Sequence, residues 1–351
     1  MILVAPTAFK GTHSAAAVTA AIMRAVQPID HNAVALPVSD GGPGLLDALQ
    51  AAQGGTLMFV NVSGPSGDAV AARVLVQSDR AVIESADACG LHLVPAGKRN
   101  PLSASTYGVG ELLLAAARRA ASIVVGLGGS ATIDGGLGMA QALGYRLLDE
   151  RGEVVARTGR SVLQLARIAG RGERLPPIVA LADVHNPLFG PAGAARIFGP
   201  QKGATPEQVE ELDAGLANVA AIMMRDLGVD VVATTGAGAA GGLGAGLRAF
   251  AGADVQMGSA WVLREFGLAA RLRSADLLIT GEGAYDAQSA MGKITGVLIE
   301  RAGVAGVPVL LVTGSVEGSV PAHVRVLQQD RLELSDIEQL VRAALPRLLR
   351  Q

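Results

Sequence analysis

Short runs of β-branched and other apolar residues alternate along this chain with segments whose apolar residues recur at helical spacing. This alternation is typical of α/β folds that are built on a largely parallel sheet. The first repeat of the pattern predicts a strand from Ile2 to Ala5, a loop from Pro6 to Gly11, and a helix from Ala15 to Val26 with Ser14 as its N-cap. Further strands are predicted at Ala33–Leu36, Leu57–Val62, Val74–Val76, Ala81–Glu84, Ile123–Gly126, Ile178–Ala182, Leu277–Thr280 and Val307–Thr313.

Two later helices carry sequence signals for their first turns. Thr205-Pro-Glu-Gln has the form of a capping box with proline at the first helical position, and Ser335-Asp-Ile-Glu repeats the box for the last helix. The strands near the two chain ends both look like interior parallel strands, so both ends are expected in one sheet. We therefore predict a discontinuous, Rossmann-like α/β domain from residues 1–60 and 265–351, with residues 61–264 forming an inserted α/β domain.

Composition agrees with a protein that has no membrane span. The 351 residues allow a sizeable core and argue for two domains. Half of the residues are hydrophobic and 17% are charged, with a mean hydropathy of +0.39, but glycine or polar residues interrupt every long apolar run. The nearest approach to a span, Val231 to Gly246, carries six glycines and two threonines and is expected to be a Gly-rich loop. No leader-like segment precedes the first strand, so we expect a cytoplasmic location.

Charge and residue types narrow the possible partners. A net charge of −2 and an aromatic content of 3% provide neither the electrostatic footprint nor the stacking platform of a nucleic-acid-binding protein. Cys89 is the single cysteine of the chain, which excludes an intramolecular disulfide and a thiolate-rich metal site. His13 and His185 lack the spacing of a metal-binding pair. Among the partner classes considered, a small-molecule ligand is therefore the one that the composition still allows.

Glycine makes up 46 of the 351 residues, about twice its usual share of roughly 7%. The glycines follow no repeat period and gather where strands are predicted to end, so we expect loops in which the backbone approaches a ligand closely. The richest of these loops follows the apolar run at Leu277 and carries Gly281, Glu282, Gly283, Asp286, Gln288, Ser289 and Lys293. Its glycines predict a sharp turn, and a helix is expected to restart near Ala287 or Gln288. Asp286 and Lys293 are seven residues apart, so they can share one helix face.

Other candidate binding residues follow other predicted strands. Lys10 lies ahead of a helix whose N–H groups can hold an anion. The loop from Gly126 to Gly136 offers backbone N–H groups for a carboxylate or phosphate. It contains Gly128, Gly129, Ser130, Thr132 and Asp134. Asp183 and Asn186 follow the strand at Ile178, and Lys202 lies in another Gly-Pro-rich loop. Open parallel sheets bind ligands outside the carboxyl ends of their strands, so these loops are candidates for one site.

Two segments resemble nucleotide-binding motifs that would compete with this interpretation. The segment from Gly236 to Gly241 matches G-x-G-x-x-G after an apolar run, which leaves a nicotinamide-dependent oxidoreductase as an alternative function. Only 12 residues separate Gly241 from Asp254, which is too short for the helix, second strand and acidic residue of that motif. Gly292-Lys293 does not form a P-loop, because Ile294 follows the lysine and Ala287 stands where the first glycine is required.

Taken together, these loops resemble the bacterial-type glycerate kinase family, of the glycerate 2-kinase kind. The resemblance rests on motifs in the same order over nearly the whole chain. They are Ala5 to Ala15, Ser39 to Gly42, Arg99 to Gly110, Gly126 to Thr132 with Asp134 to Gly136, Asp183 to Gly190, Phe198 to Ala204, Gly236 to Gly244, and Gly281 to Gly283 with Asp286, Gln288, Ser289 and Gly292-Lys293.

The resemblance implies ATP-dependent, Mg²⁺-dependent phosphorylation of D-glycerate, with 2-phosphoglycerate as the favoured product, in the cleft between two α/β domains. It also implies that the protein is a monomer or homodimer and that its ligand is the small-molecule substrate. Lys10 and Lys293 would meet phosphate charge, and Asp183 or Asp286 would act on the glycerate hydroxyl or bind Mg²⁺. Substrate contacts are expected from Asp40, Ser130, Thr132, Asp134, Asn186 and Lys202. Phosphate or nucleotide contacts are expected from Gly128, Gly129, Gly281, Glu282, Gly283, Gln288 and Ser289.

The chain departs from the family pattern at a few positions in these loops. Thr7-Ala8 stands where the family usually has Asp-Ser, Pro43 where an acid is usual, Ile133 where asparagine is usual, and Ala284-Tyr285 in place of Arg-Leu. The first three departures leave a second alternative open, a catalytically silent relative that still binds glycerate. The acids and lysines that phosphoryl transfer requires are all present.

Overall fold

The computed structural model describes residues 1–9, 12–290 and 292–348, except for the side chains of Gln288, Ala290 and Arg347. Contacts divide the chain into two compact units. The first consists of Met1–Asp40, Asp47–Gly54 and Gly258–Gln351, and the second of Gly41–Leu46 and Gly55–Met257. The main boundaries between the two units therefore lie after residues 54 and 257. The sequence had predicted them after residues 60 and 264. A cut after residue 60 would divide strand β3 (Thr56–Ser63), which pairs along its whole length within the second unit.

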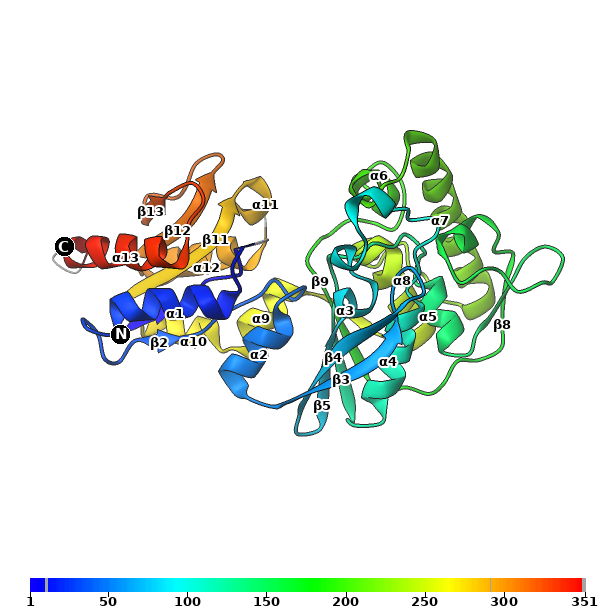
Figure 1. The fold of residues 1–351 in the computed structure, drawn as a ribbon, viewed down its shortest axis with the longest axis horizontal. Helices are drawn as coiled ribbons and strands as arrows, with labels where there is room; N and C mark the ends of the chain where they lie inside the picture. The colour runs from blue at the N-terminus through cyan, green and yellow to red at the C-terminus, as the bar shows by residue number, and fades with distance from the viewer. Residues whose placement is uncertain (10–11, 291, 349–351) are drawn as a thin grey trace. The chain divides into compact units, whose positions relative to one another are not determined.

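The first unit contains a parallel sheet of five strands in the order β13-β12-β11-β1-β2 (Figure 1). Its strands are β1 (Ile2–Val4), β2 (Val34–Ala35), β11 (Leu277–Tyr285), β12 (Val309–Val316) and β13 (Val324–Gln328). Ile2 pairs with Leu277, so the two ends of the chain share this sheet as predicted. All three residues of β1 are buried, which explains why an unbroken apolar run could be identified as an interior strand.

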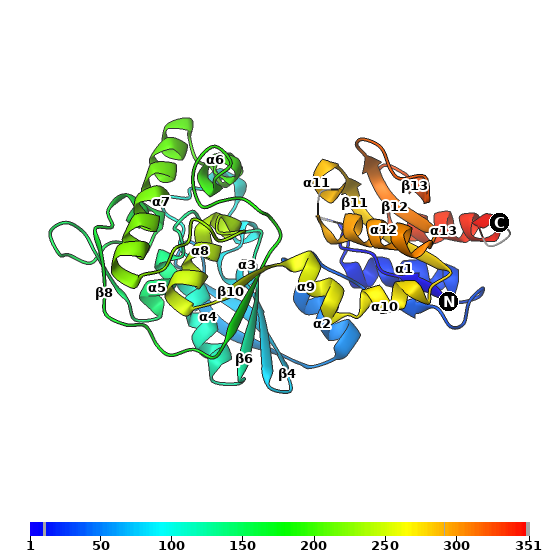
Figure 2. The ribbon, with the colours of Figure 1, turned by 180° about the vertical axis from the view of Figure 1, so that it is seen from behind.

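Helices cover both faces of this sheet. Helices α1 (Ala15–Val26) and α13 (Leu334–Leu348) pack side by side on one face, and α9 (Gly258–Glu265), α10 (Leu268–Arg273) and α12 (Ile294–Ala305) pack together on the other (Figures 1 and 2). The unit also contains α11 (Ala287–Ala290) and most of α2 (Leu45–Gln53). Ser14 caps α1 as predicted, since its hydroxyl accepts a hydrogen bond from Ala17 N at 3.2 Å.

Two predictions about this unit were wrong. Strand β11 does not turn at Gly281 and Gly283 but continues to Tyr285, because β12 pairs with it as far as Val316. A Cβ at Gly281 would lie 2.5 Å from Val312 O, so this glycine serves close strand packing. Ser335 does not begin the last helix: α13 starts one residue earlier, and Asp336 accepts a hydrogen bond from Glu333 N at 3.0 Å instead.

The second unit contains a mixed sheet of six strands in the order β10-β9-β6-β5-β4-β3. β3, β4 (Ala69–Gln77) and β5 (Arg80–Glu84) are antiparallel, while β5, β6 (Ser122–Gly126), β9 (Ile178–Ala182) and β10 (Asp254–Met257) are parallel. A separate hairpin-like pair joins β7 (Arg146–Leu148) to β8 (Arg167–Ala169). The carboxyl ends of β5, β6 and β9 therefore meet at one edge.

Six α-helices and short 3₁₀ turns surround this sheet in the described part of the unit (Figure 2). The helices are α3 (Ser85–Cys89), α4 (Tyr107–Ala117), α5 (Leu137–Ala142), α6 (Ala194–Phe198), α7 (Pro206–Leu227) and α8 (Ala239–Ala251), and the turns are Leu91–Leu93, Ala96–Lys98, Gly159–Leu163 and Pro200–Lys202. The capping box at Thr205 is confirmed, since its hydroxyl accepts from Gln208 N and the Gln208 side chain accepts from Thr205 N.

The glycine-rich segment after Val231 is only in part the loop that its composition predicted. Helix α8 begins at Ala239, is interrupted at Ala240, Gly241 and Gly242, which adopt left-handed backbone angles, and then continues to Ala251. Burial of its apolar residues against the unit's core compensates for poor helix propensity. In the described part of the chain, no helix combines the length and apolar character needed to cross a membrane.

Candidate active site

A change of winding direction in the first unit marks a place for a ligand. The chain leaves β1 toward β2 on one side and leaves the neighbouring β11 toward β12 on the other. Ligands of open parallel sheets bind at such a switch point. Here the loop after β1 is tied to β11, because Thr7 N and Thr7 Oγ1 both donate to Gly281 O, at 2.8 and 3.1 Å. Lys10, predicted to meet phosphate in this loop, lies outside the described residues.

Two carboxylates converge on one hydroxyl beside this switch point. The Ser289 hydroxyl lies 2.9 Å from Glu282 Oε2 and 3.2 Å from Asp286 Oδ1. Asp286 Oδ1 also accepts from Ser289 N at 2.8 Å, which fixes the start of α11. Glu282 is 8% exposed, and its second oxygen, Oε1, is buried with no hydrogen-bonding partner among the described residues. Gln288 belongs to the same helix, but its side chain is outside the description.

Lys293 completes this group. Its Nζ lies 3.7 Å from Asp286 Oδ1, which confirms that the two residues are neighbours. The reason differs from the prediction, since α11 ends at Ala290 and Lys293 is the N-cap of α12, so one helix does not carry both. Asp40 accepts a hydrogen bond from Ile294 N at 2.6 Å and so holds the first turn of α12.

Burial controls the charge of Glu282. The pKa of this carboxyl is raised from 4.5 to about 7, chiefly by loss of hydration and also by the nearby Asp40 carboxylate, while the Ser289 hydrogen bond and the Lys293 charge lower it. The group is therefore poised between its neutral and charged forms near neutral pH. A carboxylate of this kind, with one oxygen unpartnered, can accept a proton or ligate a cation.

The second unit gathers the other candidates at the carboxyl edge of its sheet. Lys202 is 3% exposed, and its Nζ donates to Ser130 Oγ at 2.9 Å and to Thr132 O at 2.8 Å. Burial lowers the pKa of this ammonium to about 8, and the charges of Asp134 and Asp183 offset part of that effect. Lys202 is thus hydrogen-bonded to the Ser130 loop, as a shared anion site requires, and the charge of Asp183 stabilises its ammonium.

Asp183 follows β9 and lies against the glycines of the neighbouring loops. A Cβ at Gly128 would lie 3.3 Å from Asp183 Oδ2 and 3.2 Å from Pro43 Cδ, and Pro43 also packs on Gly129. Asn186 is half-buried and donates from Nδ2 to Ala192 O at 2.8 Å. Hence Asp183, the Gly128 loop and Lys202 form one group, whereas Asn186 supports its own loop.

Asp134 lies in the interior of the second unit. It was predicted to contact the substrate, but it is fully buried and accepts hydrogen bonds from Thr106 N, Thr106 Oγ1, Gly136 N and Gly138 N. Burial raises the pKa of this carboxyl, against the effect of these hydrogen bonds. Its role is to shape the loop. Thr132 is also fully buried, and it meets Lys202 through its carbonyl rather than its hydroxyl.

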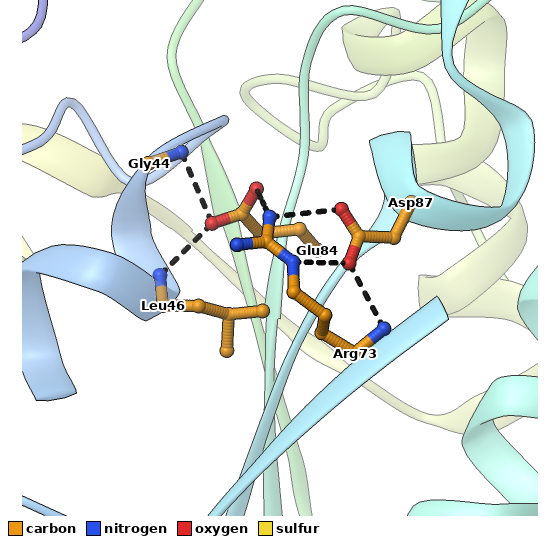
Figure 3. A network of polar contacts seen from close by, with 5 residues as sticks. All are labelled: Gly44, Leu46, Arg73, Glu84 and Asp87. Carbon is orange, nitrogen blue, oxygen red and sulfur yellow. Dashed lines mark hydrogen bonds and ion pairs between the residues drawn. The ribbon is translucent and has the colours of Figure 1, made fainter. Parts of the chain in front are cut away.

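The sequence did not single out an ionic network next to this group (Figure 3). Glu84, at the end of β5, accepts hydrogen bonds from Gly44 N and Leu46 N, and its Oε2 lies 3.5 Å from Arg73 Nη2. Arg73 is held in turn by Asp87, at 2.8 Å from Nε and 3.0 Å from Nη2. One sequence feature could have identified Glu84: it is an acidic residue at the end of the apolar run that starts at Ala81, at the edge of the sheet where ligands bind.

The Gly236 motif does not have the surroundings of a dinucleotide site. Residues 231–235 form no strand, which the motif requires ahead of its first glycine. The glycines serve packing instead: a Cβ at Gly241 would overlap the Thr132 carbonyl, and one at Gly242 would lie 2.8 Å from Gly135 Cα. Close contact with the Ser130 loop therefore explains the glycines at positions 241 and 242.

Sequence comparison decides the family. The profile of the glycerate kinase family matches residues 2–338. The chain belongs to the glycerate kinase family. A glycerate kinase of Halalkalibacterium halodurans is 44% identical over 325 residues, which cover 90% of this chain and 85% of that protein. The glycerate 2-kinase of Escherichia coli is 42% identical over 334 residues, or 91% of this chain and 86% of that one.

The fold of this glycerate kinase family member agrees with a solved structure. A crystal structure from Salmonella typhimurium LT2, named for glycerate kinase 2, superposes with a TM-score of 0.85 and 38% identity, covering 99% of this chain and 97% of that one. The predicted family and α/β fold class are therefore confirmed. The chain is a phosphotransferase, and its candidate residues fall into one group in each unit.

Proposed function

We propose that this enzyme transfers a phosphoryl group from ATP to D-glycerate, with Mg²⁺, and releases 2-phosphoglycerate. Family membership supports the reaction, and the relative named glycerate 2-kinase supports the position of the phosphoryl group. The structural observation that carries the proposal is the buried Lys202–Ser130 contact beside Asp183. It combines a cation for a carboxylate with an acid for a hydroxyl, and glycerate carries both groups.

Lys202 and the Ser130 loop would bind the glycerate carboxylate. Two of the three ammonium donors are used in the contacts to Ser130 and Thr132, which leaves one for the substrate. A charge-assisted hydrogen bond from a buried ammonium is stronger than one at the surface, because little water screens it. A hydrophobic side chain at position 202 would keep the fold and lose this contact.

Asp183 would accept the proton of the hydroxyl that is phosphorylated. In that step the hydroxyl oxygen forms a bond to the γ-phosphorus of ATP, its O–H bond breaks toward Asp183, and ADP leaves with the bridging oxygen. Phosphoryl transfer requires little covalent work by the protein, so positioning and charge account for most of the catalysis. The placement of Asp183 beside Gly128 and Lys202 favours it over Asp286 for this role.

The acids of the first unit would hold Mg²⁺. Magnesium prefers oxygen ligands and usually takes only one or two carboxylates together with phosphate oxygens. Glu282, with its unpartnered buried Oε1, and the neighbouring Asp286 fit that donor set. When bound, Mg²⁺ neutralises charge on the phosphates. Lys293 would add a positive charge to the same phosphates, and Lys10, Gly281, Gly283, Gln288 and Ser289 remain proposed phosphate or nucleotide contacts.

The departures from the family pattern do not favour a silent relative. Thr7 is bonded to Gly281, Pro43 packs against Gly128 and Gly129, and Ile133 is fully buried in the core. Each replacement is therefore accommodated by its surroundings. The cytoplasmic location and the monomeric or homodimeric state remain predictions from the sequence.

A coupled assay of ADP release tests the proposal. We expect Mg²⁺-dependent ADP formation that requires D-glycerate and is indifferent to nicotinamide nucleotides. Phosphorus NMR of the product distinguishes the 2-phosphate from the 3-phosphate. ATP consumption that is independent of glycerate, or no turnover with several divalent metals, would contradict the proposed function.

A further inference from the structure

The segment Gly41–Leu46, called the 41–46 segment below, has an unusual place in the chain. It belongs to the second unit, although the residues on both sides of it, Met1–Asp40 and Asp47–Gly54, belong to the first. It also forms the start of helix α2. Contacts within the second unit must therefore hold a short piece of chain whose neighbours on both sides are part of the other unit.

Close backbone contacts bring the segment to the edge of the sheet where Asp183 lies. A Cβ at Gly126 would lie 2.8 Å from Gly41 O, and a Cβ at Gly42 would lie 2.7 Å from Leu127 O and 3.9 Å from Asp183 Oδ2. The backbone of the segment thus borders the candidate carboxylate. Such contacts allow close approach, but van der Waals contacts alone direct the backbone weakly.

Hydrogen bonds to Glu84 orient the backbone of the segment. Glu84 Oε1 accepts hydrogen bonds from Gly44 N at 3.0 Å and from Leu46 N at 2.9 Å (Figure 3). Gly44 directly precedes α2 and Leu46 belongs to its first turn, where N–H groups lack partners within the helix and carry partial positive charge. Glu84 is 2% exposed, so its carboxylate makes these bonds away from water. Hydrogen bonds of this kind are among the stronger ones in proteins.

We propose that Glu84 is a positioning residue for catalysis, which in its ionised form holds the 41–46 segment against Leu127, Gly128 and Asp183. Arg73 from β4 and Asp87 from α3 are the charged side chains that face it. Arg73 stabilises the Glu84 charge, and Asp87 keeps Arg73 in place. The catalytic part of this inference rests on the proposed function, whereas the structural part does not.

The titration of Glu84 supports the inference. The pKa of its carboxyl is raised from 4.5 to about 7, chiefly by burial and also by the Asp87 charge, although the two backbone N–H groups and Arg73 lower it. A neutral carboxyl is a weaker acceptor than a carboxylate, so the hold on the segment should loosen as the pH falls below neutral.

Hydrogen exchange and kinetics of three variants test the inference. In Glu84→Ala the amides of the 41–46 segment should exchange at least about tenfold faster, and kcat/KM for glycerate should fall at least about tenfold, with a smaller effect in Glu84→Gln, which keeps a neutral acceptor. Glu211→Ala is the matched control, because it makes the same substitution at an exposed glutamate of α7 that lies outside this network. It should leave both measurements within about twofold of the parent.

Exchange is measured without substrate, so it tests the anchor even if the parent does not phosphorylate glycerate. Unchanged exchange in a folded Glu84→Ala variant overturns the proposal, and so does the same acceleration in Glu211→Ala. Faster exchange with kcat/KM within about twofold of the parent overturns the catalytic role. If Glu84→Ala does not fold, Glu84→Gln decides: exchange at least about threefold faster than the parent supports the anchor, and a smaller change rejects it.

Discussion

Replacement of Lys202 by methionine should separate stability from activity. The fold keeps this ammonium in a buried place that lowers its pKa from 10.5 to about 8. A shift of that size corresponds to roughly 3 kcal/mol of free energy against the charged form. Methionine removes this cost but leaves Ser130 Oγ and Thr132 O without their donor, a loss of about 1 to 3 kcal/mol for each buried group. These effects oppose each other, so the free energy of unfolding at pH 7 should change by less than about 2 kcal/mol.

Activity should respond very differently. If Lys202 holds the glycerate carboxylate, its loss should lower kcat/KM for glycerate by roughly 10²-fold or more. Steady-state ADP release and urea unfolding measure the two quantities on the same preparations. Lys98→Met is the matched control, because Lys98 is exposed and the substitution is the same.

The pH dependence of stability provides a stricter test. Since the folded-state pKa of Lys202 lies below the unfolded value, the unfolded chain binds more protons between pH 8 and 10.5. The parent should therefore gain stability relative to Lys202→Met as the pH rises through that range, by roughly 3 kcal/mol in total. A difference that stays constant from pH 7 to 10.5 would show that the ammonium is not buried at this cost. Activity within about threefold of the parent would remove Lys202 from the substrate site.

Three further predictions follow from the same contacts. Asp286→Asn and Lys293→Met should each lower kcat by roughly 10²-fold with little change in KM for glycerate, and steady-state kinetics that show both within about threefold of the parent would exclude this pair from catalysis. Because burial raises the pKa of Glu282 from 4.5 to about 7, the parent should lose stability relative to Glu282→Gln as the pH rises from 4.5 to 7, which urea unfolding at several pH values can detect. Gly241→Ala should destabilise the second unit by about 3 kcal/mol or more, because Cβ would overlap the Thr132 carbonyl at a positive φ, and an unchanged melting temperature would refute the close packing.

The candidate residues that the sequence could find share one property: they follow apolar runs. The Ser130 loop and Asp183 lie directly after strands, and the acids and amine beyond Leu277 follow the apolar start of β11, so local pattern was enough to mark them. The seven-residue spacing of Asp286 and Lys293 led to the right neighbours through the wrong element, because a short helix and a turn separate them. Spacing constrains how far two residues can be apart, but it does not determine the path between them.

Other features depend on partners that are distant in the sequence. The strand that begins at Leu277 continues past Gly281 because β12 pairs with it, and the sequence of the strand alone does not predict that pairing. Glu84 is an ordinary strand-end acid until Gly44 and Leu46, some 40 positions earlier, bring their N–H groups to it. In the same way, Asp134 has the residue type of a ligand, but four donors from its own surroundings occupy its oxygens.

The sequence by itself determined the α/β class, most strand positions and the loops that carry chemistry, because hydrophobic period and glycine placement are local properties of the chain. Only the tertiary structure decided which polar groups are buried and with which partners. Burial sets the pKa values of Glu84, Lys202 and Glu282, and it depends on atoms contributed from many parts of the chain. A residue type indicates what a side chain can do, whereas its surroundings determine the charge with which it acts.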